Sequence, residues 1–222
     1  MGAGIFYIMQ TRRFGKSTVK TLYKFPSLKL NRTVFCDSTL KVDFAYLLEF
    51  DRNVLTFQEQ PAQIKFHKDG HLHDYAPDFL VTRPEVKQLV TVKWEKYANS
   101  YEYQGLFPYI SKICKEQGFE FLVLTEESIR LQPRLSTIKL LLKYSRTQVE
   151  PQHQIICAEF LSRQGVVSFG ELVEFMESEG ASRQIAYALA FHGAFEFDLM
   201  KSFNEETAIR LTEPLIIAEK VA

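Results

Sequence analysis

Between residues 38 and 146, hydrophobic positions follow two periods, one typical of helices and one typical of strands. Apolar residues three or four positions apart follow Ser38, a residue type that caps helices, so a helix is expected there. Farther along, short runs alternate between apolar and polar residues, and Asp69-Gly70 between two of them predicts a hairpin turn. The expected elements are a helix over residues 40–51, strands over 54–60, 62–68, 71–83 and 88–93, a helix over 101–118, a strand over 119–126 and a helix over 135–146. This order predicts an α/β fold with a mixed sheet.

After Pro151 the pattern changes to three short helices followed by two strands. Ser168 and Ser182 are candidate helix caps, and several glycines are candidate helix ends. The expected elements are helices over residues 153–165, 167–180 and 181–193 and strands over 194–200 and 208–213. Three helices followed by a strand pair are the pattern of a winged-helix domain.

Charge is distributed unevenly, although the chain has 27 basic and 27 acidic residues. Residues 1–36 hold seven cations and no acid, whereas residues 158–222 hold five basic and 11 acidic residues. A basic arm predicts a contact with a polyanion such as DNA, and a solvated tail is the alternative. The candidate DNA-binding residues of the arm are Arg12, Arg13, Lys16, Lys20, Lys24, Lys29 and Arg32.

Three blocks follow from pattern and charge together. They are a basic arm over residues 1–35, an α/β domain over 36–148 and a winged-helix-like domain over 149–222. Because an acidic surface repels phosphates, a protein partner is expected for the third block rather than DNA.

Composition excludes several classes of protein. Hydrophobic residues make up 46% of the chain and charged residues 24%, as in ordinary globular proteins rather than disordered or fibrous ones. No apolar run approaches the roughly 18 residues that a membrane-spanning helix needs, and the N-terminus lacks the layout of a signal peptide. Cys36, Cys114 and Cys157 form no C-x-x-C pair, so free thiols in a reducing cytoplasm are expected, and neither a disulfide scaffold nor a zinc finger fits.

The most specific chemical motif is Pro77-Asp78 at the start of an expected buried strand, followed 15 residues later by Lys93. This layout resembles that of the PD-(D/E)xK nucleases. In such a site oxygen ligands hold Mg²⁺, which polarises the scissile phosphate, while the lysine positions the attacking water. Thr91 lies two residues before Lys93 and therefore points to the same face of the strand. On the residues alone, a turn aspartate and an exposed strand-end lysine stay open as alternatives.

Longer ordered motifs resemble those of the TnsA-type transposon endonucleases. They lie at residues 38–51, 54–61, 75–81, 89–93 and 118–130. Residues 22–29 are similar to the arm of the TnsA proteins of CRISPR-associated transposons. The resemblance covers about residues 20–220 and implies a restriction-endonuclease-like mixed sheet flanked by helices, with a C-terminal domain that binds partner proteins.

The same resemblance implies a function and its partners. A TnsA-like subunit is a Mg²⁺- or Mn²⁺-dependent endonuclease that cuts the 5′ strands at the ends of a transposon in double-stranded DNA. It acts in the bacterial cytoplasm with a TnsB-like transposase, which cuts and joins the 3′ ends, and with a TnsC-like ATPase.

Two positions of the family's metal site are substituted in this chain. Asp78 and Lys93 match the family, whereas Lys41 stands where the family has a glutamate and Thr91 where it has Glu or Gln. Lysine in place of a carboxylate removes a ligand and adds a cation where the metal would bind. At about 4 Å and an effective dielectric near 20, each pair of like unit charges costs about 4 kcal/mol.

Other acidic residues are candidates to complete the site. Asp37 lies one turn before Lys41 if the helix already includes it, Glu95 lies on the strand face of Lys93 if the strand extends that far, and Glu102 could reach in from the next expected helix. A surface charge is the favoured reading of each. Asp43 is expected to point away from the site as a solvated helix residue.

Four further residues have the chemistry of a site but a structural reading is favoured for each. His67, His71 and His73 are expected to form a polar hairpin tip, since no further metal ligand has clear spacing. Trp94 is expected to pack at the end of its strand, with stacking on DNA as the alternative.

Two functions therefore stay open. One is a TnsA-like endonuclease subunit whose metal site is substituted at Lys41 and Thr91. The other is a catalytically inactive architectural subunit on the same fold, which binds DNA and the transposase. A stand-alone winged-helix regulator is a weaker third hypothesis, because the acidity of residues 158–222 disfavours DNA binding there.

Overall fold

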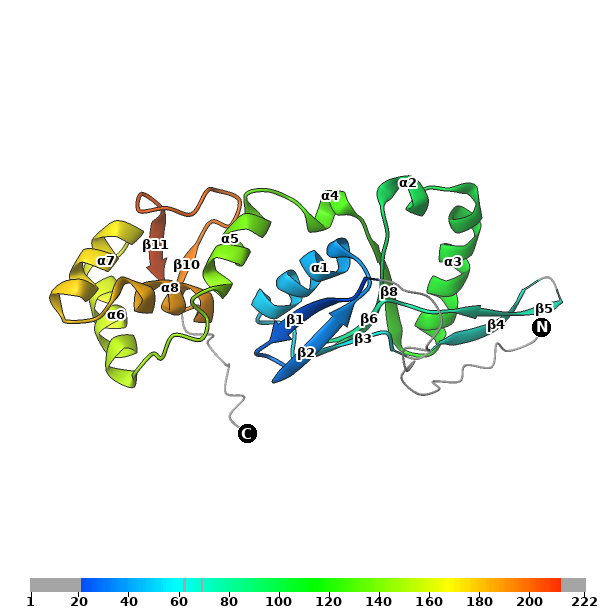
Figure 1. Ribbon diagram of the computed structural model, residues 1–222, viewed down its shortest axis with the longest axis horizontal. Helices are drawn as coiled ribbons and strands as arrows, with labels where there is room; N and C mark the ends of the chain where they lie inside the picture. Colours follow the sequence, from blue (N-terminus) through cyan, green and yellow to red (C-terminus); the bar gives the residue numbers. More distant parts are fainter. Residues whose placement is uncertain (1–20, 62, 69, 213–222) are drawn as a thin grey trace, which may run out of the picture. The chain divides into compact units, whose positions relative to one another are not determined.

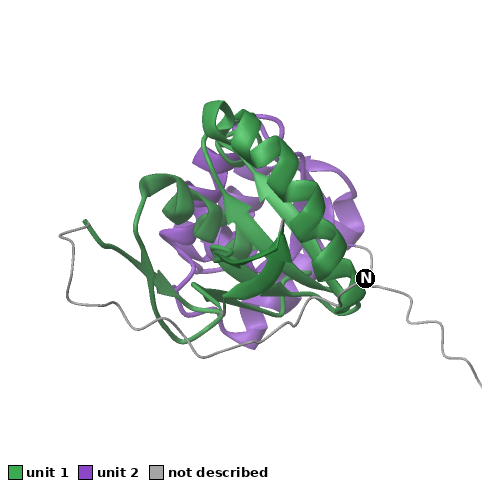
Figure 2. Cartoon of the chain, turned by 90° about the vertical axis from the view of Figure 1, so that its right-hand side faces the viewer, with its two compact units in different colours: residues 1–131 green, residues 132–222 purple. Residues whose placement is uncertain are grey.

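The structure is a computed structural model that describes residues 21–61, 63–68 and 70–212 (Figure 1). It divides into two compact units, residues 1–131 and 132–222 (Figure 2). The division lies earlier than the expected boundary at 148, because helix α5 (Arg134–Leu142) packs against helix α8 (Arg183–His192) of the second unit.

A four-stranded mixed sheet forms the centre of the first unit. Its strands are β3 (Thr56–Glu59), β6 (Phe79–Thr82), β7 (Lys87–Val92) and β8 (Phe119–Leu124), in the order β3-β6-β7-β8. The first three pair antiparallel, whereas β7 and β8 pair parallel. A parallel pair needs a crossover connection, and here it runs through helices α2 (Glu95–Ala98) and α3 (Tyr101–Glu116).

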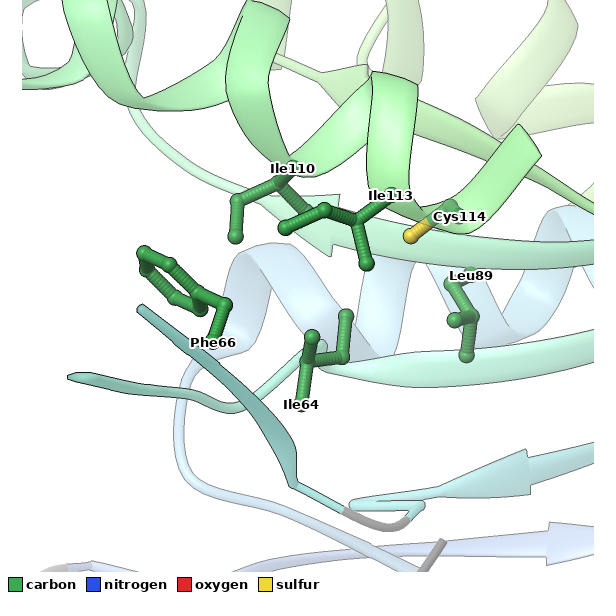
Figure 3. Packing of buried hydrophobic residues seen from close by; sticks show 6 residues of the cluster. All are labelled: Ile64, Phe66, Leu89, Ile110, Ile113 and Cys114. Carbon is green, nitrogen blue, oxygen red and sulfur yellow. The ribbon is translucent and has the colours of Figure 1, made fainter. Parts of the chain in front are cut away.

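Helices flank both faces of this sheet. Helix α1 (Thr39–Phe50) covers one face, where the rings of Phe44 and Phe79 meet edge to face at 5.2 Å. Helix α3 covers the other face, where Ile110 packs into a cluster with Leu89 (Figure 3). The other members of that cluster are Ile64, Phe66, Ile113 and Cys114. A mixed sheet flanked by helices confirms the expected architecture, which is consistent with a restriction-endonuclease-like fold.

A hairpin beside the sheet confirms the two strands expected on either side of Gly70, whereas Asp69 lies outside the described residues. Strands β4 (Ile64–Lys68) and β5 (His71–Tyr75) pair antiparallel with Lys68 opposite His71. Gly70 has φ of 79°, which suits a residue without a Cβ. Ile64 and Phe66 of β4 pack in the hydrophobic cluster between α3 and the sheet, whereas most side chains of β5 are exposed.

The last part of the expected arm is folded. Strands β1 (Tyr23–Ser27) and β2 (Arg32–Cys36) form an antiparallel hairpin that contacts α1. Its turn is held by the buried Glu49 of α1, which accepts hydrogen bonds from the Ser27 hydroxyl at 2.6 Å and from the Lys29 amide at 2.7 Å. Residues 23–36 therefore belong to the first unit rather than to a separate arm.

The second unit contains α5, α6 (Pro151–Gln164), α7 (Phe169–Ser178) and α8. A three-stranded antiparallel sheet joins them, with strands β9 (Val167–Ser168), β10 (Phe195–Phe197) and β11 (Ala208–Leu211) in the order β10-β11-β9. The three helices and the strand pair confirm the expected element order, and β9 is an addition to it.

The short helix α4 (Glu126–Ile129) lies in the first unit, after β8. Among the described residues, no helix is long and apolar enough to cross a bilayer.

Candidate functional site

Asp78 is fixed where β6 and β7 meet. Its backbone N–H donates to Val90 at 2.8 Å, and its backbone carbonyl accepts from Gln60 at 2.8 Å. The carboxylate oxygen Oδ2 accepts the backbone N–H of Val92 at 2.7 Å. These contacts leave the other carboxylate oxygen, Oδ1, to face helix α1.

The ammonium of Lys41 lies between two carboxylates. Its Nζ is 2.6 Å from Asp78 Oδ1 and 2.7 Å from Asp37 Oδ1. The side chains of Lys41 and Asp78 are only 17% and 16% exposed, so this ion pair is well shielded from water. Asp37 lies just before the N-cap Ser38 of α1 and Lys41 lies in its first turn, and Ser38 fixes this turn by accepting the Lys41 amide at 3.3 Å.

The charges at this centre stabilise one another. Burial lowers the pKa of Lys41, but Asp78 and Asp37 outweigh burial, so the pKa lies above its ordinary value and the side chain is cationic. Burial outweighs the opposing effects of Lys41 and the Val92 amide on Asp78, so the pKa of this carboxyl lies above its ordinary value. The attraction between the groups therefore offsets much of the desolvation of each.

The residues at this centre do not fit a divalent metal ion as they are arranged. Mg²⁺ needs several oxygen ligands around one point, and an ammonium can only donate hydrogen bonds. Here the point on which Asp37 and Asp78 converge is taken by the Lys41 ammonium. Within residues 21–61, 63–68 and 70–212, no group of three or more His, Cys, Asp or Glu side chains is arranged to hold a metal.

The hydroxyl of Thr91 is hydrogen-bonded to an aromatic residue. Thr91 is buried, and its Oγ1 lies 2.6 Å from the hydroxyl of Tyr75. The Tyr75 ring packs edge to face against Phe107 of α3 and Phe121 of β8. Burial raises the pKa of the Tyr75 phenol, so it stays protonated.

The ammonium of Lys93 points toward helix α3. Nζ donates to the hydroxyl of Tyr103 at 3.0 Å and lies 4.2 Å from the centroid of that ring. The backbone of Lys93 bonds to Leu124 at 3.0 Å, which fixes the residue at the end of β7. Of the four residues expected at the site, Lys41 and Asp78 thus form an ion pair. Thr91 and Lys93 are instead hydrogen-bonded to the hydroxyls of Tyr75 and Tyr103.

Of the three candidate substitute carboxylates, Asp37 is the one that contacts Lys41. The expectation that Glu95 extends the strand was wrong, because β7 ends at Val92 and Glu95 begins α2. Its side chain accepts a hydrogen bond from Asn99, and its backbone N–H donates to the Glu126 carboxylate at 2.7 Å. Glu102 is exposed in the first turn of α3.

The expectation that Asp43 is solvated was wrong. Asp43 is 6% exposed, and its Oδ2 accepts a hydrogen bond from Arg130 Nε at 2.7 Å. Arg130 follows α4 and lies 87 residues from Asp43 in the sequence, so a local sequence pattern could not predict this pair.

The three histidines lie on the β4–β5 hairpin, as expected. His67, His71 and His73 are exposed, and the His73 ring stacks on Phe66 at 5.5 Å. Trp94, which was expected to pack, is 39% exposed.

The described cations of the basic arm have different surroundings. Lys29 donates its three N–H groups to backbone carbonyls of Leu48, Asp51 and Val54, at 2.6–3.0 Å. Arg32 makes a two-pronged bond to Glu59, and Lys24 is exposed. The remaining candidates Arg12, Arg13, Lys16 and Lys20 lie outside the described residues. Lys29 therefore has no N–H left for a phosphate.

Comparison with known proteins relates this site to a family. Residues 51–126 match the family model of the TnsA-like endonuclease N terminal domain. The match includes Asp78, Thr91 and Lys93, whereas Asp37 and Lys41 precede it. A search of curated proteins finds no match to the chain. The sheet that positions Asp78 and Lys93 is therefore similar to the N-terminal domain of TnsA-like endonucleases, which supports a transposase endonuclease subunit.

Proposed function

We propose that this chain is a TnsA-like subunit of a cut-and-paste DNA transposition machine in which Lys41 blocks metal-dependent cutting. In this role it binds transposon-end DNA and the transposase as an architectural subunit. The observation that carries the proposal is the contact of the Lys41 ammonium with both Asp37 and Asp78, at 2.7 and 2.6 Å.

Electrostatics supports this choice. A Mg²⁺ ion about 4 Å from the Lys41 ammonium would be repelled by about 4 kcal/mol for each of its two charges, at an effective dielectric near 20. Moving Lys41 away removes that repulsion but breaks two ion pairs, and it still leaves the family's helix carboxylate missing. Metal binding is therefore disfavoured by charge and by the number of ligands.

A nicking assay tests the proposal. The full chain, Lys41→Glu and Lys41→Met are each mixed with the partner transposase, Mg²⁺ and transposon-end duplex, and cuts are mapped on each strand. We expect no 5′-strand cut from the unchanged chain and cutting by Lys41→Glu, because only glutamate restores a ligand. Lys41→Met is the matched control, since it removes the charge without adding an oxygen.

The second candidate function is the endonuclease itself. It is favoured by the presence of Asp78 and Lys93 at the family's positions inside the matched segment. On this reading the flexible Lys41 side chain leaves Asp78 when DNA and metal bind. The same assay separates the two functions, because the second predicts 5′-strand cutting by the unchanged chain that Asp78→Asn abolishes.

The partners follow from the family and from charge. A TnsA-like domain implies DNA and a transposase, and we propose a TnsB-like transposase and a TnsC-like ATPase, as in CRISPR-associated transposons, in the bacterial cytoplasm. Double-stranded DNA is proposed to contact the arm through Lys24 and the cations before residue 21.

The second unit is proposed to be a winged-helix-like domain that binds the partner proteins. Its helix α7 exposes Glu171, Glu174 and Glu177, and Arg183 of α8 pairs with both Glu177 and Glu205. A surface whose arginine is already paired with acids suits a basic protein partner better than DNA.

A further inference from the structure

Three large aromatic side chains stand exposed directly after the site strand. Trp94, Tyr97 and Tyr101 are 39%, 53% and 94% exposed, and we call them the aromatic patch. Trp94 is the N-cap residue of α2, Tyr97 lies in α2 and Tyr101 is the first residue of α3. The backbone N–H of Ser100, between the two helices, donates to the Tyr97 carbonyl at 3.1 Å. Single exposed hydrophobic residues are ordinary, but several large ones on neighbouring residues often mark a binding site.

Cations lie against the rings of this region. The guanidinium of Arg130 is 5.1 Å from the Trp94 centroid, and Lys96 Nζ is 4.7 Å from that of Tyr97. Arg130 is held in place by Asp43 at 2.7 Å and by Thr39 at 3.0 Å. A ligand with flat rings and negative charges suits such a surface, because its rings stack on the aromatics and its charges meet the cations.

The local charge favours unpaired nucleotides over a duplex. Between residues 93 and 103, Lys93 and Lys96 are balanced by Glu95 and Glu102, so the segment has no net charge. Binding of duplex phosphates depends on an excess of cations, which is absent here. Stacking does not need that excess, but it needs bases whose faces are free, as they are in single-stranded DNA.

The patch begins two residues after the strand that holds Asp78 in place. The Val92 amide that donates to Asp78 Oδ2 is two residues before Trp94. We propose that Trp94, Tyr97 and Tyr101 bind unpaired nucleotides of DNA by stacking, next to the Asp78 site. The inference rests on the proposed function, since a subunit that handles transposon ends would meet unpaired strands there.

Trp94 supplies its own probe, because the chain has one tryptophan. The full chain is titrated with oligothymidylate and, separately, with the same oligomer paired to oligodeoxyadenylate, while tryptophan fluorescence is recorded. We expect the single strand to quench Trp94 and the duplex to leave it unchanged. Tyr97→Ala and Tyr101→Ala should each weaken single-strand affinity at least about fivefold.

Matched variants separate stacking from other causes. Tyr97→Phe and Tyr101→Phe keep the ring, so they should keep the affinity. The inference would be overturned if oligothymidylate does not quench Trp94, or if the Phe variants lose as much affinity as the Ala variants. It would also be overturned if sedimentation shows a dimer that Tyr101→Ala dissociates, because the patch would then be a contact between copies. If duplex transposon-end DNA still binds while oligothymidylate does not, only this inference fails. If oligothymidylate binds but transposon-end duplex does not, the proposed function fails instead.

Discussion

A lysine ammonium has three N–H donors, and Lys29 and Lys41 use theirs inside the protein. Lys29 donates to the carbonyl of Leu48 in the last turn of α1, a group that a helix end leaves without an intrahelical partner, and to the carbonyls of Asp51 and Val54 beyond it. Burial lowers the pKa of Lys29, whereas the two carboxylates beside Lys41 raise the pKa of that lysine. Lys29 thus donates to carbonyls at the C-terminal end of α1 and in the chain after it, whereas Lys41 occupies a site between two carboxylates.

Replacing Lys29 tests the first of these roles. Lys29→Met removes a donor from the carbonyls of Leu48, Asp51 and Val54, although Asp51 keeps the backbone N–H of Val54, so we expect the free energy of unfolding to fall by about 1–3 kcal/mol. Urea denaturation measures it, with Lys24→Met as the control because Lys24 is exposed in the same hairpin. Lys24→Met should change stability by less than about 0.5 kcal/mol. Equal effects of the two substitutions would contradict the role given to Lys29.

At the scale of residues, sequence reasoning finds positions better than partners. The motif placed Asp78 at a strand start, and Asp37 was a candidate on the condition that the helix includes it. The helix begins only at Thr39, but Asp37 still contacts Lys41. Strand alternation put Thr91 and Lys93 on one face, but it could not say that tyrosines of other elements would bond to them. Tyr75 comes from β5 and Tyr103 from α3, so these partners are set by how the hairpin and the helix pack on the sheet.

Helix α7 begins with a capping box, in which the N-cap residue and the third helical residue bond to each other's backbone N–H groups. The Ser168 hydroxyl accepts the Glu171 amide at 3.2 Å, while the Glu171 carboxylate accepts the Ser168 amide at 2.7 Å. These two bonds satisfy donors that the first turn would otherwise leave free. Hydrogen bonds from the Ser168 amide and hydroxyl lower the pKa of Glu171.

This cap makes the stability of the second unit depend on pH in a defined direction. Because the folded-state pKa of Glu171 lies below its ordinary 4.5, its contribution is complete above pH 4.5 and is lost as pH falls through the lower value. Glu171→Gln should weaken that acid dependence, since a glutamine caps without titrating. Ser168→Ala should lower stability by about 0.5–2 kcal/mol at neutral pH. Thermal unfolding between pH 3 and 7 (roughly the titration range of carboxylates) measures both, and an unchanged acid limb in Glu171→Gln would contradict the assignment.

Long periodic elements were predictable, and short ones supported by distant contacts were not. Helices α1 and α3 follow from their apolar spacing and from Ser38 and Gly118 at their ends. The β1–β2 hairpin was missed because its cations suggested an arm. One signal for it was Asn31, which takes a positive φ of 49° in the turn, as asparagine does readily.

For the whole molecule, the structure defines which residues of the proposed DNA-binding arm can be deleted without disturbing the fold. Residues 23–36 form β1 and β2, so a deletion that reaches them would disturb the first unit. Deleting residues 1–20 removes Arg12, Arg13, Lys16 and Lys20 and spares the hairpin. Each lost phosphate contact should reduce the slope of log affinity against log salt by about 0.9 for duplex DNA. Fluorescence anisotropy at several salt concentrations measures this, and an unchanged slope would refute a DNA contact by these four cations.

The central claim is that the Lys41 ammonium takes the place of a metal ion between Asp37 and Asp78. The most direct measurement is Mn²⁺ binding, by electron paramagnetic resonance, to the purified full chain and to Lys41→Glu, with Asp78→Asn added to each as the control. We predict no specific Mn²⁺ site in the unchanged chain and one site in Lys41→Glu that Asp78→Asn removes. A Mn²⁺ site in the unchanged chain that Asp78→Asn abolishes would contradict the claim.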